Sequence, residues 1–179
     1  MKQFYIVRHC KAAGQEPDAP LTEEGVQQAE QLAEFFSGKE VEMILSSPYE
    51  RAYRTISPLA GRLELDIAVD DRLAERVLSG SNHADWRNML RLTYGDLNLR
   101  YEGGESSHAA MNRAVNVVTE ALNSDKNNIV IVSHGNLISL LLKHFDNNIG
   151  FEEWEAMSNP DVYQITFPSN HKPIVQRIW

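Results

Sequence analysis

Only one cysteine, Cys10, occurs among the 179 residues, and no apolar run is long. A single cysteine excludes an intramolecular disulfide and any metal site built from several cysteines. The longest apolar runs, residues 129–132 and 137–142, fall far short of the roughly 20 residues that a membrane-spanning helix needs. The first residues carry charge too early to form a signal peptide. We therefore expect a cytoplasmic protein with no membrane partner.

Basic residues are scarce as well. The 17 lysines and arginines face 25 acidic residues, which gives a formal net charge of −8. Because binding to nucleic acid depends on clustered basic side chains, no nucleic-acid partner is expected. The sequence also has no G-x-x-x-x-G-K-S/T loop, no G-x-G-x-x-G fingerprint and no compact group of His, Asp and Glu with metal-ligand spacing. It predicts a reaction without metal or cofactor.

Predicted strands and helices alternate along the chain. Short apolar segments predict strands at residues 3–7, 43–46, 68–69, 129–132, 162–167 and 174–178. Helical spacing and capping residues predict helices at residues 23–36, 48–61, 83–94, 106–123 and 137–145. In the first helix, Val26, Ala29 and Leu32 share one face. The alternation is typical of a three-layer α/β/α sandwich with a mostly parallel central sheet. No linker interrupts it, so residues 1–179 are predicted to form one domain.

Two of the apolar strands end in a histidine. One leads into Arg8-His9, and the other leads into Ser133-His134-Gly135. Buried parallel strands are continuously apolar, and ligands of open α/β sheets bind beyond the carboxyl ends of the strands. If the two strands are neighbours, both imidazoles emerge into one crevice beside the Arg8 guanidinium. These donors suggest an anion site, and phosphate is the anion that we expect.

Five motifs follow one another in a recognisable order. They are Arg8-His9, Ser46-Ser47-Pro48 with Arg51 behind it, Glu75, Gly103-Gly104-Glu105-Ser106 and Ser133-His134-Gly135. Together they resemble the histidine phosphatase superfamily, which includes the cofactor-dependent phosphoglycerate mutases. The resemblance implies a phosphoglycerate mutase-like fold and a metal-independent phosphomonoesterase that acts on a small phosphorylated metabolite. It also implies site roles: His9 as the nucleophile, Glu75 as the proton donor, and Arg8, Arg51 and His134 as the phosphate clamp.

The chemistry of these residue types suits the implied roles. A phosphate monoester is largely dianionic at neutral pH, so a neutral imidazole such as His9 attacks it without charge repulsion. Guanidinium groups stabilise charge on the phosphoryl oxygens through bidentate contacts. His134 would serve best protonated, and a bound dianion would raise its pKa. The leaving alkoxide needs a proton, which a Glu75 carboxyl with a raised pKa would supply before it activates water.

Three positions depart from the family pattern. Cys10 stands where a glycine normally follows the Arg-His pair, and Ala12 stands where Ser or Thr is common. Gln15 replaces an asparagine that donates to the phosphate, and its longer side chain could still reach. Cys10 would lie beside the nucleophile, where it could make the activity sensitive to oxidation or simply act as an inert small side chain.

The polar, irregular segment of residues 70–104 is the expected variable part over the active site. In a compact domain, a long segment with little regular structure is more often functional than idle. Arg76 and Arg87 are candidates at the substrate entrance for a second anionic group, although a solvated surface would also explain them. Glu105 and Ser106 are further candidates there, or they simply begin the next helix.

Other roles within this resemblance stay open. A mutase would transfer the phosphoryl group, but 179 residues leave little room for the insertion that holds a bisphosphate cofactor. A phosphatase for phosphohistidine on a partner protein needs little help from a proton donor such as Glu75. A catalytically inactive phosphate-binding module is the third alternative. The sequence identifies neither the substrate nor the oligomeric state.

Overall fold

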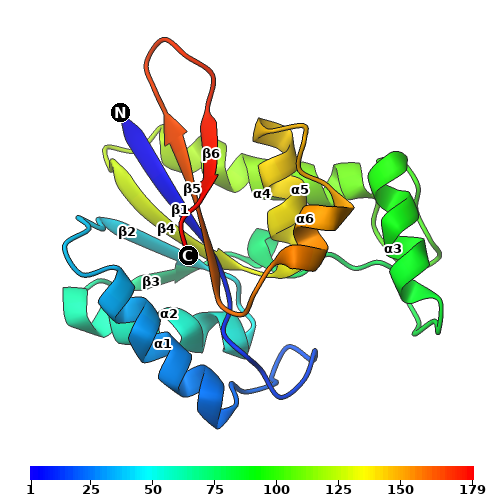
Figure 1. Ribbon diagram of the computed structural model, residues 1–179, viewed down its shortest axis with the longest axis horizontal. Helices are drawn as coiled ribbons and strands as arrows, with labels where there is room; N and C mark the ends of the chain where they lie inside the picture. Colours follow the sequence, from blue (N-terminus) through cyan, green and yellow to red (C-terminus); the bar gives the residue numbers. More distant parts are fainter.

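Six strands form one central sheet in the computed structural model, which describes residues 1–179 (Figure 1). The strand order is β3-β2-β4-β1-β5-β6. The four strands β1 to β4 run parallel, whereas β5 is antiparallel to β1 and β6 is antiparallel to β5. The strands are β1 (Lys2–Arg8), β2 (Met43–Ser46), β3 (Ile67–Val69), β4 (Asn128–Ser133), β5 (Asp161–Phe167) and β6 (Ile174–Arg177).

Helices cover both faces of this sheet, which confirms the predicted α/β/α sandwich (Figure 1). Helices α1 and α2 pack on one face, and α4 and α5 pack on the other. The helices are α1 (Glu23–Phe35), α2 (Glu50–Leu63), α3 (Trp86–Gly95), α4 (Ser107–Leu122), α5 (Gly135–Phe145) and α6 (Phe151–Ala156), with a 3₁₀ turn at Asp71–Leu73. No helix combines the length and the apolar character that crossing a membrane requires.

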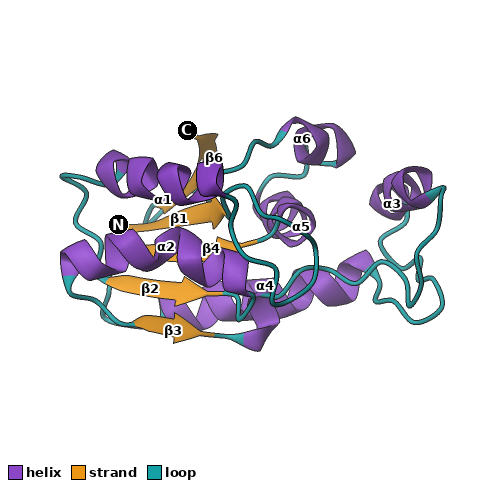
Figure 2. Cartoon of the chain, turned by 90° about the horizontal axis from the view of Figure 1, so that it is seen from below, coloured by secondary structure: helices purple, strands orange, loops and turns teal.

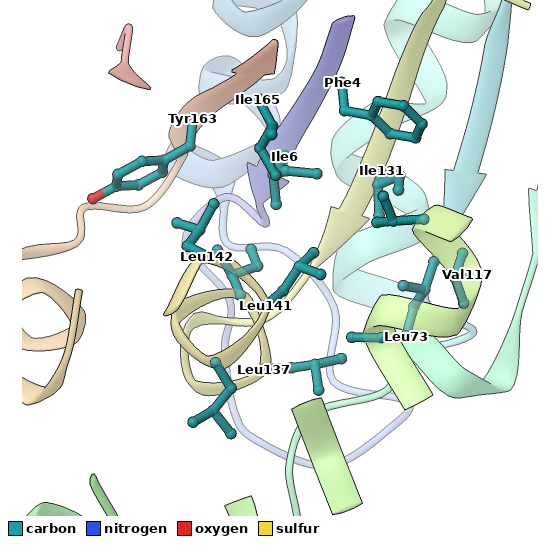
Figure 3. Packing of buried hydrophobic residues seen from close by; sticks show 14 of the residues in the cluster. Phe4, Ile6, Leu73, Val117, Ile131, Leu137, Leu141, Leu142, Tyr163 and Ile165 are labelled. Atoms are coloured by element: carbon teal, nitrogen blue, oxygen red, sulfur yellow. The ribbon is translucent and has the colours of Figure 1, made fainter. Parts of the chain in front are cut away.

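Alternate side chains of β1 point to opposite faces of the sheet. Phe4 and Ile6 join the core beneath α4 and α5 (Figure 3), while Tyr5 and Val7 join the core beneath α1 and α2. Both layers are buried, so the strand is apolar at every position from 4 to 7. This two-sided burial is the reason that the central strands read as continuous apolar runs.

One residue on the apolar face of α1 lies outside the core. Val26 on α1 is 55% exposed, although Ala29 and Leu32 on the same predicted face are buried. The gap between this first part of α1 and the facing part of α2 stays open as a surface cavity, which Val26, Arg54 and Pro58 help to line. Helical spacing therefore identified the correct face, but the partner helix does not cover it along its full length.

The segment of residues 70–104 leaves the sheet and carries α3 to the end of the molecule (Figure 2). Its two ends run side by side, because Gly80 N donates to the Glu102 carbonyl at 2.9 Å and Glu105 N donates to the Val77 carbonyl at 2.8 Å. Gly103 has a φ of +74°, and a Cβ on it would lie 2.6 Å from the Gly80 Cα. Only glycine permits this close crossing of the two chain segments.

Candidate active site

The two histidines meet at the carboxyl ends of β1 and β4. These strands are parallel neighbours, and their register pairs Arg8 with Ser133, so both strands end at the same level. The backbone N–H of His9 donates to the Ser133 carbonyl at 3.2 Å, and this bond joins the two loops beyond the sheet. The ring centroids of His9 and His134 lie 5.2 Å apart. The two strands that end in a histidine are therefore neighbours, and their imidazole rings lie side by side.

His9 carries the lone electron pair of its imidazole on Nε2. Its Nδ1 lies 2.7 Å from the Cys10 carbonyl oxygen, which can only accept, so Nδ1 carries the proton. Nε2 instead accepts from the Arg51 Nε–H at 3.2 Å. Burial lowers the pKa of His9 to about 4; the bond to the Cys10 carbonyl opposes this shift, and the Arg51 and Arg8 charges add to it. At neutral pH the ring is therefore uncharged.

Arg8 and Arg51 are guanidinium groups that have only neutral acceptors. Arg51 is 1% exposed and donates through Nη1 to the backbone carbonyls of Gln15 and Glu16 at 3.1 and 2.8 Å. Arg8 donates through Nη1 to the Met157 carbonyl at 3.1 Å, and its buried Nε has no partner. Burial lowers the pKa of both side chains, and the nearby Glu75 charge opposes that shift. Buried cations without a contacting carboxylate favour a bound anion.

Gly135 makes room for the Arg8 guanidinium. A Cβ at this position would lie 3.0 Å from both Cζ and Nε of Arg8. This close approach explains why a glycine follows His134 at the end of β4. A larger residue would push the guanidinium away from its place beside the histidines.

His134 is neutral in this structure, whereas the expected protonation of its ring concerned the complex with a dianion. It is fully buried, and this burial lowers its pKa well below the usual value, with the His9, Arg51 and Arg8 charges acting in the same direction. Its Nε2 lies 2.7 Å from the Ser47 hydroxyl, while its Nδ1 is buried without a partner. A bound dianion would counteract the surrounding positive charge, so the expected protonation belongs to the complex with substrate.

Glu75 is fixed at the N-terminus of α5. Its Oε1 accepts from the Leu137 N–H at 2.9 Å and the Arg76 N–H at 2.7 Å, and its Oε2 accepts from the Asn136 N–H at 3.1 Å. The carboxyl group thereby satisfies amides that the first turn of a helix leaves unpaired. Because His134 is the N-cap of the same helix, the start of α5 holds Glu75 close to the two histidines.

The three departures from the family pattern have separate outcomes. Cys10 is fully buried, its N–H donates to the Thr55 hydroxyl at 2.8 Å, and burial raises the pKa of its thiol to about 11. A protonated, buried thiol is a weak nucleophile, so the structure favours the inert alternative. Ala12 forms an isolated antiparallel bridge with Leu21. Gln15 holds Arg51 through its backbone carbonyl and is among the residues that line a neighbouring cavity.

The four residues predicted at the substrate entrance have different surroundings in the structure. Arg76 is 5% exposed and lines a cavity of about 550 Å³ together with Gln15, Ser79, His83 and Trp86. Arg87 instead forms an ion pair with Glu155 of α6.

Glu105 and Ser106 bind other parts of the protein. The Glu105 carboxylate pairs with Arg113 at 2.9 Å and accepts from the Val77 N–H at 3.0 Å. Ser106 is the N-cap of α4 and accepts from the Ala109 N–H at 3.1 Å. Both residues therefore tie the start of α4 in place, as the alternative of a simple helix start foresaw.

Two contributing residues received no role from sequence reasoning. Ser47 was noted only as part of a turn, although its hydroxyl contacts His134. Asn159 donates through Nδ2 to the His9 carbonyl at 2.9 Å and so fixes the backbone at His9. The motif around Ser47 was the available signal for the first. Nothing in the local sequence indicates the second, because Asn159 reaches His9 only through the pairing of β5 with β1.

The neutral state of His9 has a consequence for acid stability. Its pKa is about 4 in the folded protein and about 6.5 in an unfolded chain, so the unfolded state binds the proton first as pH falls. Stability is full above pH 6.5 and declines toward pH 4, by about 3 kcal/mol for this group. We expect His9→Ala to lose less free energy of unfolding than the wild type between pH 7 and pH 4.5 in urea titrations. Equal losses would contradict a buried neutral His9.

The site can be compared with those of known proteins. The family model described as histidine phosphatase superfamily (branch 1) matches residues 4–178. Phosphoserine phosphatase 1 of Hydrogenobacter thermophilus is 29% identical, with 75% of this chain and 71% of that protein covered. A probable phosphoglycerate mutase GpmB of Proteus mirabilis is 30% identical, with 79% and 74% covered.

Solved structures agree with this match over nearly the whole chain. A mycobacterial glucosyl-3-phosphoglycerate phosphatase in complex with VO3 superimposes with a TM-score of 0.81 at 25% identity and covers 99% of this chain and 98% of that chain. The complex of that phosphatase with inorganic phosphate gives a TM-score of 0.80 at 27% identity, with 100% and 96% covered.

Proposed function

The chain belongs to the histidine phosphatase superfamily, and we propose on this basis that it hydrolyses phosphate monoesters of small metabolites through a phosphohistidine at His9. One observation carries the proposal. The His9 Nε2 electron pair faces the Arg51 guanidinium, and neither Arg51 nor Arg8 contacts a carboxylate. A nucleophile and two uncompensated cations at one point suit a phosphoryl dianion. Relatives named for phosphoserine and glucosyl-3-phosphoglycerate support a small phosphorylated metabolite.

Binding comes first in the proposed mechanism. The phosphoryl oxygens take the unpartnered Nε–H of Arg8, the Nδ1 side of His134 and the Nε–H of Arg51 that faces His9. When an oxygen accepts from the Arg51 Nε–H, the His9 Nε2 electron pair is released toward phosphorus. Positioned donors that neutralise the equatorial oxygens supply most of the stabilisation in such transfers.

Phosphoryl transfer then follows in two steps. Glu75 takes up a proton when the substrate dianion binds beside it. His9 Nε2 then forms a bond to phosphorus, and the ester oxygen leaves with its bonding electrons and takes that proton from Glu75. The Nδ1–H of His9 stays bonded to the Cys10 carbonyl, which stabilises the positive charge that develops on the ring. Water next attacks phosphorus while the Glu75 carboxylate accepts its proton, and breaking the N–P bond restores the neutral imidazole.

Trapping the phosphorylated enzyme tests this proposal. The protein is mixed with ³²P-labelled phosphoserine and other phosphomonoesters in the presence of a chelator, and it is quenched in alkali, where phosphohistidine persists. We expect a labelled, acid-labile adduct and release of one inorganic phosphate for each ester consumed. Turnover that disappears with the chelator and returns with a divalent ion would contradict the proposal. Transfer to a second substrate in place of phosphate release would indicate a mutase.

Arg76 gives a second prediction about the substrate. We propose that residues 70–104 frame the substrate entrance and that Arg76 binds a second anionic group there. Its guanidinium is buried and contacts only the Glu105 carbonyl and the Thr93 hydroxyl, so its charge has no contacting carboxylate. Arg76→Met should raise KM roughly 10- to 100-fold for esters that carry a carboxylate, because a hydrogen bond to a charged group is lost.

Substrate pairs and a matched variant control this measurement. Neutral alkyl phosphates should show little change in KM with Arg76→Met. Arg91→Met, which removes an exposed guanidinium from α3 that bonds Asn88, should leave KM unchanged for both kinds of ester. An equal loss on neutral and carboxylated esters would mean that Arg76 only supports the fold of its segment.

A further inference from the structure

The Ser47 hydroxyl lies between two partners in a fully buried position. Ser47 follows the last residue of β2, and its Oγ is 2.7 Å from His134 Nε2. The same Oγ accepts from the Tyr49 N–H at 3.2 Å, so its hydroxyl proton is free to point at the imidazole. The Tyr49 ring packs against the His134 ring with centroids 4.9 Å apart. Neighbours on two sides thus hold the ring in one orientation.

The direction of the Ser47–His134 hydrogen bond decides where His134 carries its proton. If the Ser47 O–H donates to Nε2, the ring carries its proton on Nδ1, and Nδ1–H is then the one group without a partner. If Nε2–H donated to Ser47 instead, both the serine proton and the Nδ1 electron pair would be buried unpaired. Each unpaired buried polar group costs free energy. The arrangement in which the Ser47 O–H donates to Nε2 leaves only one such group and is therefore favoured.

We propose that Ser47 is a positioning residue that holds His134 as the Nδ1–H tautomer and thereby aims a donor at the phosphoryl oxygens. The inference rests on the proposed function, because the orphaned Nδ1–H needs an anionic acceptor. His9 carries its proton on Nδ1 as well, for a different reason, since its acceptor is the Cys10 carbonyl. The two histidines therefore present opposite groups to the substrate: His9 an electron pair at Nε2, and His134 a proton at Nδ1.

Nitrogen NMR of the free enzyme tests the tautomer without any turnover. In ¹⁵N-histidine-labelled wild type, we expect His134 to show a protonated Nδ1 and an unprotonated Nε2. Ser47→Ala should shift His134 toward a mixture of tautomers. The matched control is Ser46→Ala, since Ser46 is equally buried and its hydroxyl donates to the Ser47 carbonyl at 2.9 Å and not to the histidine. A wild-type His134 protonated at Nε2 would overturn the proposal.

Titration with inorganic phosphate and kinetics separate this inference from the proposed function. Phosphate should shift the Nδ1 resonance of wild-type His134, and an unchanged resonance with phosphate bound would overturn the donor role. Ser47→Ala should lower kcat/KM by roughly 10- to 100-fold, because the His134 ring loses the hydrogen bond that orients it. Ser47→Thr, which keeps the hydroxyl, should retain the wild-type tautomer. A wild type with the expected tautomer and phosphate response but no hydrolysis would refute the phosphatase alone.

Discussion

Replacing His9 with alanine is expected to abolish turnover and to leave the fold intact. The variant loses the Nε2 electron pair that attacks phosphorus, and the adjacent Cys10 thiol is buried and protonated, so it does not replace the imidazole. Loss of a covalent nucleophile lowers kcat by roughly 10⁴-fold or more. Initial rates on an aryl phosphate, together with the absence of a trapped phosphoenzyme, measure this effect.

Folding of the variant is expected because His9 lies outside both apolar clusters of the core. The side chain contributes one hydrogen bond to the Cys10 carbonyl and accepts one from Arg51, so circular dichroism and thermal unfolding at neutral pH should change little. His144→Ala is the matched control, since His144 is an exposed histidine on α5, and it should keep full activity. Substantial activity in a folded His9→Ala protein would refute the assigned nucleophile.

Glu75→Gln should slow hydrolysis in a manner that depends on the leaving group. An alkoxide leaves phosphorus poorly without a proton, whereas a nitrophenolate leaves readily. A positioned proton donor accelerates such a reaction roughly 10²- to 10⁴-fold. We expect Glu75→Gln to lower kcat by this factor for alkyl phosphates such as phosphoserine. For p-nitrophenyl phosphate, the formation of the phosphoenzyme should be nearly unaffected. Burst kinetics on the two substrates measure the difference.

The same variant can weaken the start of α5, so stability must be measured beside activity. Glutamine keeps one carbonyl oxygen for the amides of Asn136 and Leu137 but places an NH₂ group where Oε1 or Oε2 now accepts. Thermal unfolding should show a modest loss, because one cap interaction of about 1 kcal/mol is weakened. Equal slowing of phosphoenzyme formation on alkyl and aryl phosphates would mean that Glu75 positions the site and does not supply the proton.

Much of the site was predictable because each part of it lies in a short stretch of sequence. An apolar run buried on both faces, followed at once by a histidine, indicates a central strand and the group at its end. Arg8 directly precedes His9, and Arg51 lies in the first turn of α2 after the Ser47-Pro48 turn. Local periodicity and adjacency carry this information, and they also predicted the helices and strands that surround the site.

The tertiary structure decided everything that depends on distant residues meeting. The contact between Ser47 and His134 joins positions 87 residues apart, and that between Asn159 and His9 joins positions 150 apart. The two candidate arginines at the entrance look alike in sequence, yet Arg76 is buried beside a cavity and Arg87 is neutralised by Glu155. The sequence alone indicated the six strands, every α-helix except α6 and the chemical groups at the ends of the strands. Strand order, burial and the choice of partner were decided only in the folded protein, because they depend on packing between segments that no local pattern relates.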